Sequence, residues 1–282
     1  MDVINQWASD HTEGMIDKIL NEDSFDPDAI SYLLNAIYFK GSWMLEFNPS
    51  WTKEESFNGG NKVFMMRQED GFSYMGTETY QAIQLPYGAY QMSVFLPRQD
   101  KSIDDVIDQI DGNRWQFKSQ YCHVDLKLPR MEIETHIDLK DVMSTLGMTR
   151  AFDPQLAEFP YFCNVSSYIG LMKQVAKMKV DEKGTEASSV TVIPMEPTGM
   201  PTYVEFYANR PFLYIISEQS TGVILFIGQY MGDAKATTPE RIANTEMTSI
   251  KDAPLYNLNG QRMERPHVKG LYIQNGKKMV VK

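Results

Sequence analysis

The residues best suited to covalent chemistry in this sequence are two cysteines and four histidines, and one of each is adjacent, Cys122 and His123. A thiol beside an imidazole is the pair that activates a cysteine nucleophile. Neighbouring residues in a strand, however, point to opposite faces, and both lie in a strand-like run. We therefore expect Cys122 and Cys163 to be small buried side chains and expect no catalytic residue in this chain.

Metal and phosphate chemistry is also weakly represented. The sequence contains no C-x-x-C, H-E-x-x-H, G-x-S-x-G or P-loop pattern. The acidic stretch DDVIDQIDG (104–112) lacks the spacing of a calcium-binding EF-hand loop. It is typical of the solvated face of a short helix, and we predict neither a metal nor a cofactor.

Charge and hydropathy exclude two further classes of function. The 282 residues carry a formal charge of −10 without Lys/Arg clusters, which argues against nucleic-acid binding. No apolar run approaches the ~20 residues that span a bilayer, so we predict no transmembrane segment. A hydrophobic content of 43% is enough for a substantial core.

The elements that would position any site follow an α+β pattern. A helix is expected from residue 3, with Gly14 as a break, and a second helix at 139–146 before Gly147. The run at 29–40 predicts a central strand buried on both faces. Further strands are predicted at 82–86, 91–96, 124–128, 131–136, 171–180 and 203–207, with a hairpin at 211–216 and 223–229 around EQSTG.

The composition changes after residue 229. Residues 234–247 are small and polar and suit an exposed linker. Short strand patterns then resume with Asn-Gly turns at 259–260 and 275–276. We expect a small β-module at 248–282, which resembles C-terminal modules of some bacterial surface proteins.

The stretch VDEKGTEASSVTV (180–192) follows a strand but forms neither a core pattern nor a turn. Gly184 lets the backbone turn without a Cβ penalty. Thr185 is uncharged, Ala187, Ser188 and Ser189 are small, and the β-branched residues that follow favour a strand. The local pattern alone assigns no role to this stretch.

The same stretch carries a family resemblance. LLNAIYFKGSW, FNPSWTKEESF, MMRQ, LPRMEIETHIDLKDVMSTLGMTRAFD, VDEKGTEASS, ANRPFLYII and TGVILFIGQ resemble, in order, the second part of a serpin. The resemblance implies a serpin-like domain at 1–233, with a large, mostly antiparallel central sheet, a second sheet and helices. Complete serpins begin earlier, so we expect an N-terminally truncated chain whose missing helical part would carry an export signal.

In serpins the EKGTEA stretch is the hinge of a reactive-centre loop, which is cleaved by a protease and inserts into the central sheet. The resemblance implies an irreversible inhibitor with hinge residues Glu182, Gly184, Thr185, Glu186, Ala187, Ser188 and Ser189. The family's spacing places the cleaved bond between Thr198 and Gly199, with Met195 or Met200 as alternatives. A small Thr suits elastase-like or subtilisin-like serine proteases, and the same trap extends to cysteine proteases.

The resemblance assigns roles to four further residues. Residues 33–40 and 173–182 resemble the two strands that separate to admit the loop. Trp43 and Arg130 correspond to the point where insertion begins, with Arg130 paired to Glu182. Asn35 and Gln174 fall where the family places polar groups that exchange hydrogen bonds as the strands part, and Gln174 replaces a common His.

Two departures leave an alternative open. Pro194 and Pro197 lie in the segment that would insert, and each lacks a donor for a central strand. Val190 also replaces a residue that is usually small. The alternative is a non-inhibitory serpin-like fragment with a binding or structural role, whose loop is cleaved as a substrate. For either function we expect an extracellular, periplasmic or cell-surface location.

Overall fold

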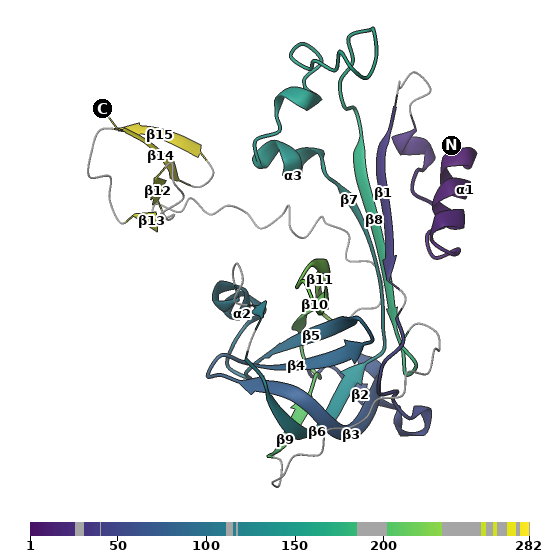
Figure 1. Cartoon of the computed structure of the whole chain (residues 1–282), viewed down its shortest axis with the longest axis vertical. Helices are drawn as coiled ribbons and strands as arrows, with labels where there is room; N and C mark the ends of the chain where they lie inside the picture. The colour runs from purple at the N-terminus through teal and green to yellow at the C-terminus, as the bar shows by residue number, and fades with distance from the viewer. Residues whose placement is uncertain are drawn as a thin grey trace.

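A computed structural model of the chain describes residues 1–25, 31–39, 41–110, 115–116, 118–184 and 202–232, together with the backbone of four C-terminal strands. The α-helices are α1 (Asp2–His11), α2 (Ile103–Gln109) and α3 (Lys140–Thr145). Short 3-10 helices occur at Glu22–Ser24, Pro49–Trp51 and Arg150–Phe152. Strands dominate the rest, as Figure 1 shows.

A three-stranded sheet has the order β1 (Leu33–Phe39), β8 (Met172–Val180), β7 (Met131–Asp138). β1 is parallel to β8, and β7 is antiparallel to β8. The first helix covers one face, where Ala8 of α1 and Ile16 and Ile19 after it form a small core with Val175 (Figure 1).

The expectation that the 29–40 run is buried on both faces is wrong for β1. Its residues are exposed or half-buried except for Phe39, which is buried, and among the described strands it pairs only with β8. The physical reason is that α1 covers one face of this sheet, so only alternate side chains of β1 reach its small core.

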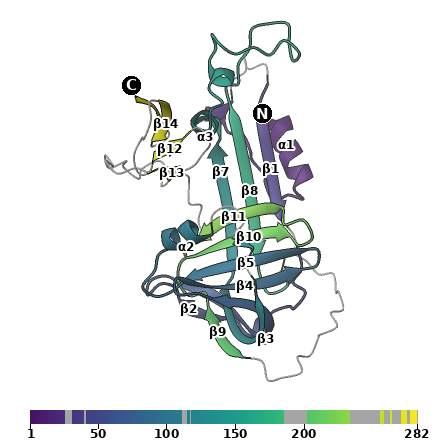
Figure 2. The same cartoon turned by 60° about the vertical axis from the view of Figure 1, so that its left-hand side comes forward.

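An eight-stranded sheet lies across the lower end of the first (Figures 1 and 2). Its path is β11-β10-β5-β4-β3-β6-β9, and β2 pairs with β3. The bounds are β2 (Lys53–Ser56), β3 (Lys62–Gly76), β4 (Tyr80–Tyr87), β5 (Tyr90–Pro97), β6 (Gln120–Pro129), β9 (Tyr203–Tyr207), β10 (Phe212–Glu218) and β11 (Ile224–Tyr230). The predicted hairpin is confirmed as β10 and β11, which are antiparallel.

The largest core joins the two sheets. Phe39, Met178 and Val180 from the lower end of the three-stranded sheet belong to the same buried cluster as Met65 and Leu126 of the eight-stranded sheet. The ends of β1 and β8 are therefore anchored in the main core, whereas their beginnings lie beyond it.

Cys122 and His123 do not form a catalytic pair, because adjacent residues of a strand point to opposite faces. Cys122 is fully buried, and burial raises the pKa of its thiol. The His123 side chain is instead directed to Glu69, with Nε2 3.2 Å from Oε1. Cys163 is only half-buried, which corrects the expectation that both thiols are interior.

The predicted short helices are both present. α2 buries Ile103 and Val106 while Asp104 and Asp108 stay exposed, as expected for a solvated acidic face. α3 ends before Gly147, whose φ of 108° is the left-handed conformation that a helix end favours. None of the described helices is long and apolar enough to cross a membrane.

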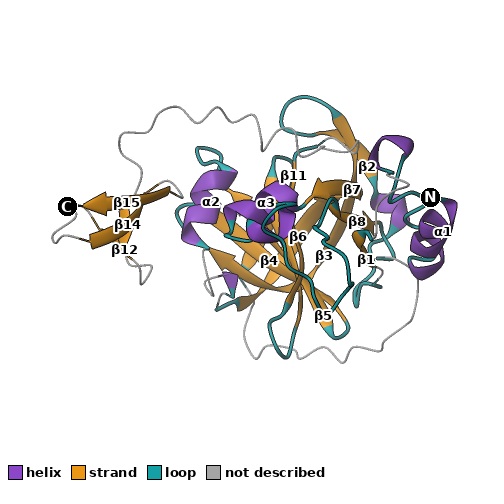
Figure 3. Cartoon of the chain, turned by 90° about the horizontal axis from the view of Figure 1, so that it is seen from above, coloured by secondary structure: helices purple, strands orange, loops and turns teal. Residues whose placement is uncertain are grey.

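The C-terminal strands form a separate four-stranded sheet, drawn in orange with the other strands in Figure 3. Its order is β13 (Arg262–Met263), β12 (Leu255–Asn257), β14 (Gly270–Gln274), β15 (Lys277–Val281), and every pair is antiparallel. The predicted Asn-Gly turns at 259–260 and 275–276 and the predicted linker at 234–247 lie outside the described residues, and the domain limits stay a prediction.

Candidate functional site

The hinge turn, residues 181–184, closes directly after β8. Gly184 N–H donates to the Asp181 carbonyl at 3.1 Å, and Lys183 N–H donates to the Asp181 carboxylate at 3.0 Å. Gly184 has a φ of 89°. A Cβ at this position would lie 2.3 Å from the Gly41 carbonyl oxygen and 2.6 Å from the Trp43 nitrogen. Both the backbone angle and the close approach therefore require glycine here.

Trp43 attaches the hinge turn to the segment after β1. Its backbone N–H donates to the Lys183 carbonyl at 3.2 Å, and its indole Nε1–H donates to the Asp181 carbonyl at 2.8 Å. The ring is buried and stacks on Tyr87, with centroids 3.9 Å apart. The predicted position of Trp43 beside the start of the loop is thus consistent with these contacts.

Glu182 is the charged centre of this turn. Its side chain is 7% exposed, and its carboxylate accepts hydrogen bonds from Arg130 Nε at 2.9 Å and Nη2 at 2.6 Å. Thr52 also donates its hydroxyl to this carboxylate. Burial raises the pKa of Glu182, but the hydrogen bonds from Arg130 and Thr52 outweigh burial and leave it below its usual range. The carboxylate therefore stays charged in a nearly closed site.

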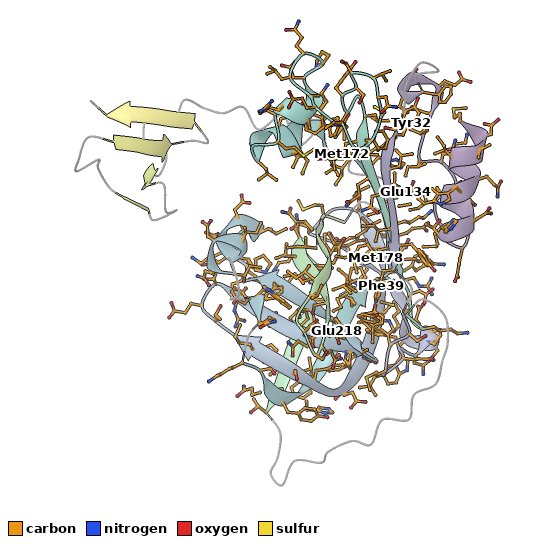
Figure 4. All side chains as sticks on the ribbon, turned by 45° about the horizontal axis from the view of Figure 1, so that its top comes forward. Tyr32, Phe39, Glu134, Met172, Met178 and Glu218 are labelled. Carbon is orange, nitrogen blue, oxygen red and sulfur yellow. The ribbon has the colours of Figure 1, made fainter. Side chains whose placement is uncertain are left out.

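The seam is the line along which β1 and β8 pair, from Leu33↔Met172 to Phe39↔Met178. Figure 4 labels Met172 near its upper end and Phe39 and Met178 near its lower end. Asn35 and Gln174 are direct register partners, and Asn35 Nδ2 donates to Gln174 Oε1 at 3.3 Å. The two residues assigned to a polar exchange across separating strands therefore do meet across the seam.

The far end of the loop is held by a different sheet. β9 pairs with β6 in parallel, and just before β9 the Thr202 carbonyl accepts the His123 N–H at 3.0 Å. Asp125 of β6 is buried and accepts two hydrogen bonds from Arg67 at 2.8 Å and one from the Tyr207 hydroxyl at 2.6 Å. Burial raises the pKa of Asp125, but these hydrogen bonds lower it by more than burial raises it. The pKa therefore lies below its usual range and the group stays charged.

Seven of the predicted site residues fall between these two anchors. Thr185, Glu186, Ala187, Ser188, Ser189, Thr198 and Gly199 lie outside the described residues. Their roles stay predictions. The described residues bring together the remaining six in two groups, Glu182, Gly184, Trp43 and Arg130 at the hinge turn and Asn35 with Gln174 at the seam.

Three residues of the hinge site were not predicted from the sequence. Thr52 and Tyr87 complete the hinge site but lie far from it in sequence, and no local pattern marks them. Gly41 offered a signal, because a glycine within a strand-like run often marks a site that another backbone approaches closely. A Cβ on Gly41 would lie 2.9 Å from the Phe39 ring and 3.0 Å from the Tyr87 ring.

The arrangement is suited to conformational change. In the part of the chain that the structure describes, no group of three or more His, Cys, Asp or Glu side chains is placed to hold a metal ion. The elements present are a glycine-dependent turn, a buried ion pair beside it and a parallel seam with a polar pair. A chain that reverses at the hinge turn runs antiparallel to both β1 and β8.

Comparison with known proteins places this geometry in a family. The sequence profile of the family described as serpin (serine protease inhibitor) matches residues 1–232. Plasminogen activator inhibitor 1 of Bos taurus is 31% identical over 245 residues, which cover 81% of this chain and 60% of that protein. Glia-derived nexin of Rattus norvegicus is 33% identical, with 81% of this chain and 61% of the relative covered.

Solved structures give the same result. The thermophilic serpin tengpin in the native state matches with a TM-score of 0.69 and 30% identity, covering 82% of this chain and 62% of the other. Native protease nexin-1 with heparin matches with a TM-score of 0.70 and 31% identity, covering 82% and 65%. The chain thus spans about three fifths of the length of these proteins. It belongs to the serpin family.

Proposed function

We propose that this chain acts as an irreversible inhibitor of serine proteases, through a loop that is cleaved between Thr198 and Gly199 and inserts into the seam. The observation that carries the proposal is strand direction. β1 and β8 are parallel, and the chain reverses at the hinge turn, so residues after Gly184 can form an antiparallel strand between them. One parallel ladder is then replaced by two antiparallel ladders, which are the more stable kind per residue.

Insertion would let this chain inactivate a protease without a catalytic step of its own. The protease attacks the loop and forms an acyl bond to the residue before the cleaved bond. Inserting the loop carries the protease away from its original position and distorts its active site before water completes hydrolysis. The catalytic residues belong to the protease, and this chain supplies the conformational free energy.

The target class is proposed from the loop sequence. Thr198 is small and uncharged, which suits the shallow specificity pocket of elastase-like or subtilisin-like proteases. Cysteine proteases are a further class, because their thioester intermediate can be trapped by the same movement. Such targets fit the proposed extracellular, periplasmic or cell-surface location of a bacterial-type serpin.

The test is to incubate the full 282-residue chain with an elastase-like and a subtilisin-like protease and to measure intact mass and denaturing-gel mobility. The expected result is a covalent complex together with a released peptide that begins at Gly199. Thr185→Arg is the matched variant, because a charged side chain at the hinge resists burial between strands. It should be cleaved at the same bond without forming the complex. Cleavage of the wild type without a complex would overturn the proposal.

The second candidate function, a substrate-like serpin with a binding or structural role, is favoured by two prolines. Pro194 and Pro197 each lack a ladder donor, so insertion that stops before them would leave time for hydrolysis. Replacing both by Ala distinguishes the candidates. A wild type that is only cleaved, with a variant that forms the complex, would assign the substrate function to the prolines.

A further inference from the structure

A surface pocket of about 280 Å³ lies where the end of β5 meets the segment between β9 and β10, and none of its lining residues belongs to the hinge turn or the seam. The residues that border it include Gln81, Arg98, Glu205, Tyr207, Asn209 and Arg210. Its volume is close to the lower limit of ~300 Å³ for small-molecule sites. It is therefore large enough for one small polar ligand.

The two arginines are held in place by the backbone. Arg98 Nε donates to the Thr77 carbonyl at 3.1 Å, and Arg210 Nε donates to the Pro97 carbonyl at 2.9 Å. Arg210 Nη1 also donates to the Asn209 Oδ1 at 3.2 Å. The Nη2 group of each arginine keeps its donors for a ligand. Arg98 Nη2 also lies over Gly76, where a Cβ would come within 3.1 Å of it. Such fixed guanidinium groups are preorganised for an anion with several oxygens.

The positive charge of the pair is not neutralised. Neither arginine forms an ion pair with a carboxylate among the described residues, and both side chains are only half-exposed. Burial lowers the pKa of Arg210, and the nearby positive charge of Arg98 lowers it further. Two close guanidinium groups repel each other, and a bound anion would remove that repulsion.

A neutral donor completes the set. Gln81 is buried, and its Oε1 accepts a hydrogen bond from the Tyr74 hydroxyl at 3.3 Å. This contact fixes the amide so that Nε2 remains as a donor at the pocket. Glu205 opposes an anion, but it is an exposed side chain of β9.

From this juxtaposition we propose that Arg98, Arg210 and Gln81 form a binding site for a tetrahedral oxyanion, a phosphate or sulfate, either free or as a small monoester. The ligand would connect the end of β5 to the segment that follows β9. Because β9 carries the distal anchor of the 185–201 loop, occupancy would stabilise that anchor.

The site is tested by titration calorimetry and thermal unfolding of the full chain in a low-salt buffer without phosphate. The probes are inorganic phosphate, inorganic sulfate and glucose 6-phosphate, with glucose as the uncharged control. Tighter binding of glucose 6-phosphate than of phosphate would identify a monoester as the ligand, and equal binding would identify the free ion. Both results support the site.

Three variants and a matched control make the test specific. Arg98→Gln and Arg210→Gln should each weaken binding about tenfold or more, because a charge-assisted hydrogen bond is lost. Glu205→Gln should strengthen it, since a repelling carboxylate is removed. Arg150→Gln makes the same charge change at an exposed arginine paired with Glu158, and should leave the affinity unchanged. Absence of binding to the wild type, or equal affinities in all five proteins, would overturn the proposal.

Discussion

Arg130 and Glu182 form a bidentate ion pair in which the Glu182 side chain is 7% exposed and the Arg130 side chain 43% exposed. The pair is thus asymmetric, because one partner is desolvated and the other still contacts water. The Glu182 carboxylate needs hydrogen-bond donors from the protein because little water reaches it. The Arg130 guanidinium can instead be solvated by water if the carboxylate is removed. This asymmetry decides what each substitution at the hinge turn should do.

Removing Arg130 should lower the free energy of unfolding by more than the loss of an exposed ion pair does. Arg130→Ala leaves a buried carboxylate with Thr52 as its remaining side-chain donor, and we expect the free energy of unfolding to fall by about 2 kcal/mol. Urea denaturation measures the change. Arg150→Ala, at an arginine that is 70% exposed, should change it by less than ~0.5 kcal/mol. Similar losses in both variants would contradict the asymmetry.

The ion pair should also contribute to acid sensitivity. The folded pKa of Glu182 is lowered, so its contribution is complete above the unfolded value of about 4.3 and is lost as the pH falls through the folded value. The free energy of unfolding of the wild type should therefore fall below about pH 4. Glu182→Gln should reduce this fall.

The matched control for acid sensitivity is Glu46→Gln, which removes an exposed carboxylate of the same kind. It should retain the fall of the wild type below about pH 4. Denaturation curves at several pH values, taken side by side for the three proteins, give the comparison. If the free energy of unfolding of Glu182→Gln falls below about pH 4 as steeply as that of the wild type, other groups cause the acid sensitivity.

A comparison of two glycines separates the two reasons for which Gly184 is required, its positive φ and its close contact with neighbouring backbone. Gly184→Ala introduces both an unfavourable φ and a clash with the backbone of residues 41 to 43. Gly88→Ala introduces only the unfavourable φ, because nothing lies within 4 Å of its added Cβ. We expect Gly88→Ala to cost about 1 kcal/mol and Gly184→Ala clearly more. Thermal unfolding and limited proteolysis at the hinge turn measure both, and equal costs would mean that the turn shifts freely.

The Asn35–Gln174 hydrogen bond should be a weak, local coupling. A double-mutant cycle with Asn35→Ala and Gln174→Ala should give a coupling energy of about 0.5 kcal/mol, because the pair is exposed to water. A cycle between Asn35→Ala and Lys53→Ala, at the exposed first residue of β2, should give none. A zero value for the first cycle would remove Asn35 and Gln174 as a functional pair.

Local patterns predicted most strands because their side chains alternate. β9 and β8 were found within one residue of their bounds. β3, the longest strand, was missed. Its buried positions change phase between Met65 and Met66, which are both buried, and Gln68 then occupies an interior position. A search for strict alternation of buried and exposed residues fails where the buried side of a strand changes partway along it.

The site depended on pairings that no local pattern contains. Asn35 meets Gln174 and Arg130 meets Glu182 only because β1, β7 and β8 become neighbours in the folded sheet. Resemblance supplied those pairs. Resemblance did not supply the burial of Glu182, because that burial depends on the folded turn, which Trp43 and Thr52 contact from distant parts of the sequence.

The two anchors of the 185–201 loop belong to different sheets, since Gly184 is bound to the segment after β1 and Thr202 is bound to β6. The covalent chain between them is therefore a tether that joins the two sheets, independent of any side-chain contact. One cut anywhere along it turns a closed loop into two free ends and returns the entropy of loop closure. A single broken peptide bond can thus separate the hinge turn from β9 while every hydrogen bond described above is still in place, because the core and the short link at Arg130 between β6 and β7 still join the sheets.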